Sequence, residues 1–247
     1  MVNEKIKKHA IAAKKLNLIK DNAFKLIRKN IGRITEYEVH EFIISEFKRQ
    51  GLVTDRRNPI QIVAVNQNAA IPHYFPASLK SDLIKKNNLI LIDIWARLNK
   101  DNSPFADITW IGYSGRKVPK DIKDTFKKVL GARDRALDFI RKELKERRLP
   151  RAREMDEAAR DYFKGFDLDR FFIHKTGHSL GTVNCHGKSF NLSRTSRKRL
   201  KLNVLFTIEP GLYFNNKFGI RSEIDCYITN NYKLVVTTKI QKEIIKI

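Results

Sequence analysis

The sequence predicts an α+β fold with two related halves, at about residues 1–118 and 119–247, that face each other around a shared sheet. The first observation is the order of the elements: two helical patterns followed by short apolar or β-branched runs, an order that occurs twice along the chain. The second is a pair of long apolar runs joined by a polar turn, which is typical of antiparallel strands. The two halves share no visible sequence identity, so the duplication rests on the pattern of elements.

The first half begins with helices. Apolar residues recur at helical spacing among lysines, which predicts one long helix or two over residues 4–29. Thr35 and Glu38 have the spacing of a capping box, so a second helix is expected to begin there and to stop at Gly51. A run rich in β-branched residues then predicts a strand at residues 60–65.

A loop and a hairpin complete this half. The loop NQNAAIPHYFP contains His73 and precedes the runs LILIDIWARL, at residues 89–98, and FADITWIGY, at residues 105–113. Both runs are expected to be strands. The polar segment NKDNSP between them predicts a turn, so the two strands should pair antiparallel.

The second half repeats the order of the first. Helical periodicity predicts a long helix at residues 119–147 and a shorter one at residues 151–164. The runs that follow are rich in β-branched and aromatic residues, as expected for strands. The expected strands are residues 170–174, about 178–185, 203–214, 219–229 and 233–238.

Length and composition indicate a globular protein. A chain of 247 residues, 42% of them hydrophobic, can bury a sizeable core as one large domain or as two closely packed halves. No run approaches the roughly eighteen apolar residues that a membrane helix needs, and the lysine-rich start differs from a signal peptide. Cys185 and Cys226 are the only cysteines, too few for a disulfide framework. These features predict a cytoplasmic protein without membrane contact.

The charge is strongly basic. There are 50 lysine and arginine residues against 27 aspartate and glutamate residues, a formal net charge of +23, and basic residues are densest at 142–153 and 194–201. Such a surface can attract acidic substrates or a polyanion such as RNA or DNA, or it can consist of solvated helix faces. No nucleic-acid motif accompanies the charge. This favours solvated faces and leaves a weak polyanion contact as the lesser alternative.

Five residues spread along the chain predict a metal site. Four carboxylates and one imidazole form an oxygen-rich set, which suits two neighbouring divalent ions better than one closed zinc site. Without cations between them, four carboxylates held close together would repel each other strongly. The strings LILIDIW, FADITW, HKTGHSLG, FTIEPGLY and GIRSEID contain, in this order, Asp93, Asp107, His178, Glu209 and Glu223.

Each of these residues alone has an ordinary interpretation. Asp93 could accept hydrogen bonds from backbone amides at a strand edge, His178 could be a satisfied histidine of the core, and either glutamate could lie on the surface. Gly177 and the strand-like run after it argue against a helical pair of zinc-binding histidines at His174 and His178. The occurrence of all five residues together favours the metal site.

The ordered strings resemble those of the pita-bread metallopeptidases, which include methionine aminopeptidase, aminopeptidase P and prolidase. The resemblance covers about residues 21–240 and includes the proline after Glu209 and the glycine before His178. It implies a pita-bread fold, with two pseudo-symmetric α-β halves around a curved, mainly antiparallel sheet. It also implies a single catalytic domain over residues 1–247, without a separate amino-terminal domain.

The resemblance implies two divalent ions, which would be Mn, Co, Fe or Zn, with Mn favoured. Asp93 would bind one ion, and Asp107 would bridge both. His178 and Glu209 would each bind one ion, and Glu223 would be the second bridge. The implied reaction is the hydrolysis of the first peptide bond by a hydroxide that the metals activate, with Glu209 as the catalytic proton shuttle.

Further residues resemble the substrate-binding groups of the family. His73 would stabilise the tetrahedral intermediate, and His174 would hydrogen-bond the substrate, which makes both catalytic. Arg221 could anchor a substrate carboxylate or carbonyl, or orient the bridging glutamate. His186 resembles a third catalytic and substrate-binding histidine, but it lies one residue later than expected, at the position after Cys185. An insertion, the favoured alternative, would place His186 in the pocket, whereas a substitution would place Cys185 there.

The spacing of the two aspartates departs from the family. Asp93 and Asp107 are 14 positions apart, which is longer than in many members. The turn between the two strands can accommodate the additional residues without moving the base of the hairpin. A β-bulge would keep both side chains on the same face.

The strings HKTGHSLG and GIRSEID look like those of the proline-peptidase branch, and the segment with two tryptophans looks like a group of aminopeptidase P-like proteins. The resemblance therefore implies an aminopeptidase that removes the first residue of a peptide substrate, with Xaa-Pro preference. The alternatives are methionine aminopeptidase-like specificity and a pita-bread binding module for nucleic acid or protein. A homodimer is a further arrangement that the resemblance allows.

Overall fold

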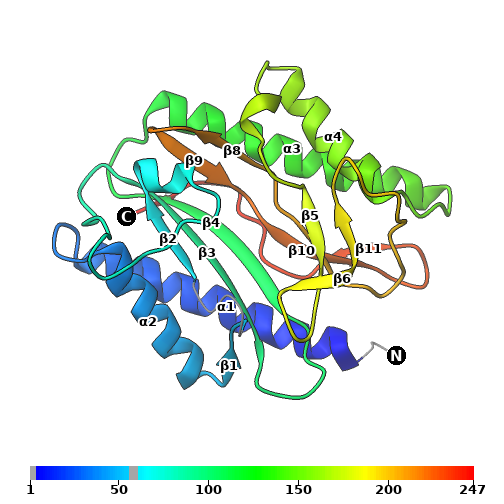
Figure 1. Ribbon diagram of the computed structural model, residues 1–247, viewed down its shortest axis with the longest axis horizontal. Helices are drawn as coiled ribbons and strands as arrows, with labels where there is room; N and C mark the ends of the chain where they lie inside the picture. Colours follow the sequence, from blue (N-terminus) through cyan, green and yellow to red (C-terminus); the bar gives the residue numbers. More distant parts are fainter. Residues whose placement is uncertain (1–3, 56–60) are drawn as a thin grey trace.

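The computed structural model describes residues 4–55 and 61–247, and it confirms the α+β class (Figure 1). Within these ranges, strands occupy the middle of the molecule, with two helices on one side of them and two on the other. The helices are α1 (Glu4–Lys29), α2 (Glu36–Arg49), α3 (Lys120–Lys145) and α4 (Ala152–Lys164). Their bounds lie within two residues of the predicted ones, and the first pattern forms one helix rather than two.

The predicted capping box fixes the start of α2. The backbone N–H of Glu38 donates to Thr35 Oγ1 at 3.2 Å, and the N–H of Thr35 donates to Glu38 Oε2 at 2.8 Å. These bonds satisfy donors that no carbonyl of the helix can reach. Gly51 follows the helix with a φ of +66°, a left-handed conformation that glycine adopts without strain. The helix therefore begins and ends where the sequence predicts.

The first sheet is built on the hairpin of β3 and β4. β1 and β2 both pair with the free edge of β3, and β12 adds parallel to β4, whereas the other pairs are antiparallel. The strands are β1 (Leu52–Val53), β2 (Ile62–Val65), β3 (Leu89–Leu98), β4 (Ala106–Tyr113) and β12 (Ile245–Lys246). β3 has the predicted bounds, and Ile60 of the predicted strand 60–65 lies outside the described residues.

The second sheet has the strand order β11-β10-β7-β5-β6, and β8 and β9 form a separate antiparallel hairpin. The two sheets adjoin where β4 contacts β10. The strands of the sheet are β5 (Gly177–Leu180), β6 (His186–Leu192), β7 (Phe206–Ile208), β10 (Ile224–Ile228) and β11 (Leu234–Val236). The hairpin strands are β8 (Gly211–Phe214) and β9 (Phe218–Arg221).

One predicted strand is wrong. Residues 170–174 do not pair in the structure, and the 3₁₀ helix η2 (Asp169–Phe171) begins this segment. Its aromatic side chains pack instead: the rings of Phe172 and Phe163 are both buried, with centroids 5.4 Å apart. Apolar and aromatic composition here reflects burial, which β-propensity cannot separate from strand pairing. In the predicted strand at 178–185, only residues 178–180 belong to a strand, as part of β5, and β6 follows this segment without having been predicted.

The two longest predicted strands of the second half are interrupted at glutamates. Residues 203–214 divide into β7 and β8 at Glu209, where Pro210 has no N–H to donate to a neighbouring strand. Residues 219–229 divide into β9 and β10 at Glu223. Both interruptions place a predicted metal ligand outside the regular strand pairing.

The two faces of β3 belong to different hydrophobic clusters. Ile90 and Ile92 pack with the cluster that includes α1 and α2, whereas Leu91 and Trp95 pack with the cluster that includes α3 and α4. Successive side chains of a strand point to opposite faces, so Asp93 shares the face of Leu91 and Trp95. Asp93 therefore points away from α1 and toward the interior between the two halves.

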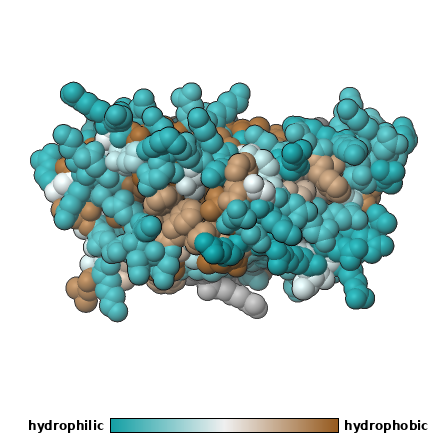
Figure 2. All heavy atoms as spheres, turned by 90° about the horizontal axis from the view of Figure 1, so that it is seen from above, coloured by the Kyte–Doolittle hydropathy of each residue, from teal (hydrophilic) through white to brown (hydrophobic). Residues whose placement is uncertain are grey.

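One face of the molecule is largely hydrophilic. Figure 2 shows the molecule from above the view of Figure 1, with hydrophilic side chains covering most of this face and hydrophobic atoms visible between them near its middle. Within residues 4–55 and 61–247, none of the helices has both the length and the apolar character that crossing a membrane requires.

Candidate metal centre

Asp93 and Asp107 lie on the same face of the β3–β4 hairpin. Asp93 pairs with Thr109 and Asp107 pairs with Trp95, so the two aspartates are diagonal neighbours. The suggestion of a β-bulge between them is wrong, because β3 and β4 pair in regular register from Leu89 to Ala96. Odd-numbered residues of β3 pair with odd-numbered residues of β4, and paired residues point to the same face of the sheet. Positions 93 and 107 are both odd, so a separation of 14 keeps the two side chains on one face.

The other three predicted ligands come from the second half. His178 lies on β5, Glu209 follows β7, and Glu223 precedes β10. The backbone N–H of Glu209 donates to the carbonyl oxygen of Thr176 at 2.8 Å, which holds the interruption close to β5. In a paired strand, successive side chains point to opposite faces of the sheet. Glu209 and Glu223 lie between strands, so this alternation does not fix the direction of their side chains.

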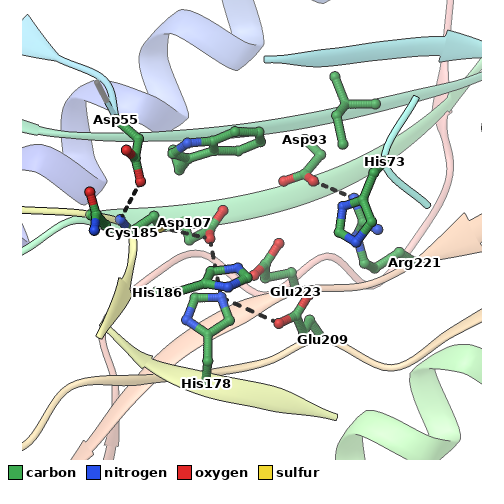
Figure 3. Close-up of a pocket in the computed structure, with 13 residues that line it drawn as sticks. Asp55, His73, Asp93, Asp107, His178, Cys185, His186, Glu209, Arg221 and Glu223 are labelled. Carbon is green, nitrogen blue, oxygen red and sulfur yellow. Dashed lines mark hydrogen bonds and ion pairs between the residues drawn. The ribbon is translucent and has the colours of Figure 1, made fainter. Parts of the chain in front are cut away.

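The structure brings these side chains together (Figure 3). One ligand atom each of Asp107, His178 and Glu223 lies within 4.8 Å of the others. His178 Nε2 is 3.4 Å from Glu209 Oε1 and 3.7 Å from Asp107 Oδ2. Asp93 lines the same cavity. All five predicted ligands therefore face one space.

The cavity has a volume of about 250 Å³ and lies where the two halves meet. Three of the predicted substrate groups, His73, His186 and Arg221, line it together with the five ligands. The remaining lining residues are Asp55, Ile62, Trp95, Asn184 and Cys185.

Three carboxylate oxygens in the cavity have no hydrogen-bond partner among the described residues. They are Asp93 Oδ1, Asp107 Oδ1 and Glu223 Oε1, on residues that are at most 6% exposed. A buried carboxylate oxygen without a donor is costly, and a divalent cation is a partner that such hard oxygen donors fit well. The residues present therefore fit a divalent metal centre.

Burial dominates the electrostatics of this cluster. It is the largest cause that raises the pKa of Asp107 and the pKa of Glu223 well above their ordinary values, and neighbouring carboxylates raise both further. Burial also raises the pKa of Asp93, but the guanidinium of Arg221 opposes this shift. Cations placed among these side chains would relieve the repulsion and favour the ionised carboxylates.

His178 presents one nitrogen to the carboxylates. Its Nδ1 lies 3.1 Å from the carbonyl oxygen of Ser179, to which it donates as a neutral imidazole. Burial is the main cause that lowers the pKa of His178 to about 3, so the ring is neutral at pH 7. The lone pair of Nε2 then faces Glu209 and Asp107, which is the tautomer needed to bind a metal through Nε2.

Arg221 orients two of the predicted ligands. Its Nη2 donates to Asp93 Oδ2, and its Nε donates to Thr109 Oγ1 at 3.0 Å. Thr109 in turn donates to Glu223 Oε2 at 2.7 Å. Asp93 thus uses one oxygen for the guanidinium, and its Oδ1 is one of the unpartnered oxygens. Of the two roles predicted for Arg221, these contacts support the orientation of ligands.

His73 and His186 reach the cavity from different halves. His73 belongs to the loop after η1 (Asn66–Ala70) and is exposed. His186 begins β6, and its ring contacts that of His178 in a tilted arrangement, with centroids 3.9 Å apart and an angle of 39° between the ring planes. Both predicted substrate histidines are therefore placed beside the metal ligands.

His174 does not line the cavity. Tyr213 OH donates to His174 Nε2 at 2.7 Å, and His174 Nδ1 donates to the carbonyl oxygen of Lys175 at 2.8 Å. The same hydroxyl accepts from Arg221 Nη1 at 2.9 Å, so His174 is connected to the ligands through Tyr213 and Arg221. The catalytic and substrate-binding role of His174 stays a prediction.

Cys185 and His186 both line the cavity, so the two alternatives that the sequence left open are not exclusive. Cys185 Sγ donates to Asp107 Oδ2 at 3.1 Å, and the Cys185 N–H donates to Asp55 Oδ2 at 2.9 Å. Burial raises the pKa of the Cys185 thiol well above its ordinary value, which keeps the sulfur protonated beside the carboxylate.

Three further residues of this cluster were not predicted from the sequence. Thr109 and Asp225 lie in the same strings as Asp107 and Glu223, and Asp225 Oδ2 accepts from the backbone N–H of Asp107 at 2.9 Å. Their position two residues from a ligand was an available signal, because alternate residues of a strand share a face. Asp55 follows β1 without a motif around it, so the sequence carries no comparable signal for it.

Comparisons with known proteins identify the family of this chain. Residues 8–230 match the model of metallopeptidase family M24. The chain is 30% identical over 228 residues to an inferred Xaa-Pro aminopeptidase of Mycoplasma genitalium, which covers 92% of this chain and 59% of that protein. It is 28% identical over 170 residues to a Xaa-Pro dipeptidase of Pyrococcus furiosus, which covers 69% of this chain and 44% of that protein.

A solved structure gives the same result. Recombinant prolidase from Thermococcus sibiricus matches with a TM-score of 0.83 at 27% identity, covering 99% of this chain and 61% of that chain. The chain thus spans about three fifths of the Mycoplasma protein and of this prolidase. The pita-bread class predicted from the five strings is confirmed, and the chain belongs to metallopeptidase family M24.

Proposed function

We propose that this chain is a dinuclear metal-dependent aminopeptidase, which removes the first residue of a peptide whose second residue is proline. The observation that carries this proposal is the set of unpartnered buried oxygens of Asp93, Asp107 and Glu223, on side chains that line one cavity together with His178. The names of the relatives, Xaa-Pro aminopeptidase and Xaa-Pro dipeptidase, support the proline preference.

The five ligands would hold two divalent ions. In Figure 3, Asp107 and Glu223 lie between Asp93 and His178, which supports bridging roles for these two carboxylates. Mn, Co, Fe and Zn all accept such ligands, and the mainly oxygen set favours Mn. Two bound ions supply an activated water as nucleophile and polarise the carbonyl of the first peptide bond.

Glu209 is the residue that we assign to proton transfer. Its side chain is 13% exposed, and Oε1 lies 3.4 Å from His178 Nε2. The same oxygen accepts from Thr207 Oγ1 at 3.2 Å, which helps to fix its position. A carboxylate held at this place can accept a proton from the attacking water and deliver it to the leaving nitrogen.

The other lining residues can bind and orient the peptide. His73 can donate a hydrogen bond to the oxygen that becomes negatively charged during the attack. His186, whose ring contacts that of His178, can hydrogen-bond the substrate backbone. Ile62 and Trp95 supply apolar surface of the kind that a proline ring can contact.

Two alternatives use the same fold. Methionine aminopeptidase-like specificity would keep the metal centre and change only the preferred residues. A binding module for nucleic acid or protein would draw on the net charge of +23. Binding of that kind would not explain the unpartnered oxygens of Asp93, Asp107 and Glu223. The peptidase is therefore the better-supported function.

A peptide panel tests the proposal. Protein loaded with Mn or Co should release the first residue of Xaa-Pro-Yaa faster than that of Met-Ala or of a peptide without proline. Glu209→Gln should lower kcat by at least about 100-fold. Glu157→Gln, at an exposed glutamate of α4, is the matched control and should leave kcat unchanged. Preferred cleavage of Met-Ala would select the alternative specificity, and no cleavage of any peptide with either metal would contradict the proposal.

A further inference from the structure

Cys185 lies inside the candidate metal centre. It is 3% exposed, lines the cavity and directly precedes β6. Its Sγ donates a hydrogen bond to Asp107 Oδ2 at 3.1 Å, and Figure 3 shows it on the side of Asp107 away from Asp93. A sulfur atom is thus in contact with Asp107, a predicted bridging ligand. The five predicted ligands themselves offer only oxygen and nitrogen atoms.

Backbone contacts fix the place of this sulfur. The Cys185 N–H donates to Asp55 Oδ2 at 2.9 Å, and the Cys185 carbonyl oxygen accepts from the N–H of Gly181 at 2.9 Å. A Cβ at Gly181 would lie 2.2 Å from the carbonyl oxygen of Asn184, so this close turn between β5 and β6 requires glycine. Asp55 and the turn therefore hold Cys185 against Asp107 through both of its backbone polar groups.

The distances around Asp107 Oδ2 are within about 0.1 Å of those between ligands of one ion. Zn–S bonds of about 2.3 Å and Zn–O or Zn–N bonds of about 2.0 Å place neighbouring ligands of a tetrahedral ion roughly 3.2–3.6 Å apart. Cys185 Sγ is 3.1 Å from Asp107 Oδ2, and that oxygen is 3.7 Å from His178 Nε2. Independently of the thiol, the unpartnered Asp107 Oδ1 and Glu223 Oε1 indicate a cation in the cavity that Cys185 also lines.

We propose that Cys185 is a further ligand of the ion held by Asp107 and His178, so that this position binds a metal that accepts sulfur, such as Zn, Co or Fe, in preference to Mn. The inference rests on the proposed dinuclear centre and assigns different preferences to its two positions. When the sulfur–metal bond forms, the thiol proton leaves to solvent and no atom changes its oxidation state. The position beside Asp93 has oxygen ligands and keeps its preference for harder ions such as Mn.

Cobalt-loaded protein gives an optical test. Co(II) bound to a thiolate shows a sulfur-to-cobalt charge-transfer band in the near ultraviolet, whereas the visible bands of Co(II) report bound cobalt whatever its ligands. The proteins compared are wild type, Cys185→Ser and Cys226→Ala. Cys226 lies on β10 within the hydrophobic core and is not among the residues that line the cavity, so it provides the matched control.

We expect visible bands in all three proteins, and the charge-transfer band in wild type and Cys226→Ala but not in Cys185→Ser. The chain has two cysteines, so a band that persists in Cys226→Ala assigns the sulfur to Cys185 even if the serine variant does not fold. In a second readout, Cys185→Ser should lower the ratio of zinc affinity to manganese affinity by at least about tenfold.

The outcomes separate this inference from the proposed function. Cobalt-loaded wild type without a charge-transfer band, or a band that remains in Cys185→Ser, would overturn the role of Cys185 and leave the dinuclear centre intact. Absence of the visible bands from all three proteins would contradict the metal centre itself, and the role of Cys185 with it.

Discussion

Thr109 Oγ1 donates to Glu223 Oε2 at 2.7 Å, across the boundary between the two halves of the molecule. Thr109 lies on β4 opposite Asp93, and its hydroxyl also accepts from Arg221 Nε at 3.0 Å. The residue has no exposed surface. A single hydroxyl therefore links a ligand of the second half to the strand that carries Asp107.

Replacing Thr109 with valine should weaken metal binding. Valine has nearly the same shape but no hydroxyl, so Glu223 loses a donor and Arg221 loses an acceptor. Loss of such a partner typically costs roughly 10–100-fold in metal affinity. Calorimetric titration of zinc into Thr109→Val and Thr109→Ser measures the effect, and the serine variant should bind nearly as well as wild type. Equal affinity in the valine variant and wild type would show that the hydroxyl does not support the site.

His73→Ala should lower kcat and leave KM nearly unchanged. The charge on the substrate oxygen develops only during the reaction, so a donor aimed at it stabilises the transition state more than bound substrate. The expected loss is roughly 100–1,000-fold in kcat on an Xaa-Pro peptide. The residue is exposed, and the melting temperature should therefore change little. A raised KM with an unaltered kcat would instead make His73 a residue for substrate binding alone.

His9 should make the folded protein sensitive to acid. Burial lowers the pKa of His9 to about 4, and its ring nitrogens contact Phe105 O at 2.8 Å and Thr237 Oγ1 at 2.7 Å. The unfolded chain takes up a proton at the ordinary histidine pKa of 6.5, whereas the folded protein resists it until about pH 4. The stability that the neutral ring contributes is therefore present above pH 6.5 and is lost as the pH falls below it.

The expected loss through His9 is about 2 kcal/mol in the free energy of unfolding between about pH 7 and about pH 5. Urea unfolding of metal-free wild type and His9→Gln at both pH values measures it. Glutamine does not titrate, so the variant should lose about 2 kcal/mol less. Asp225, 3.7 Å from His9 Nε2, and the other histidines are present in both proteins, and their contributions largely cancel. The same acid loss in both proteins would be incompatible with this role.

Local patterns explain which parts of the fold could be predicted. The bounds of β3 follow from a continuous apolar run around Asp93, and the start of α2 follows from the spacing of Thr35 and Glu38. Each predicted metal ligand also lies in a distinct short string, so the set could be assembled without knowing the contacts. Signals of this kind depend on neighbours in the sequence, which the chain itself displays.

The parts that could not be predicted depend on contacts between distant segments. The apolar runs around Glu209 and Glu223 read as continuous strands, and only the pairing partners in space show where they end. His174 lies in the same string as the predicted ligand His178, but its ring is bound by Tyr213 and does not line the cavity. Cys185 meets Asp107 because a turn folds back across the boundary between the halves, a contact without a local pattern in the sequence.

The number of metal ions per chain tests the central claim most directly. Protein stripped with a chelator, equilibrated with Mn, Co or Zn and freed of excess metal can be analysed by elemental mass spectrometry. We expect about two ions per chain for wild type and for Asp138→Asn, an exposed aspartate of α3, and fewer for Asp107→Asn. A wild-type chain that retains none of these metals would contradict the account.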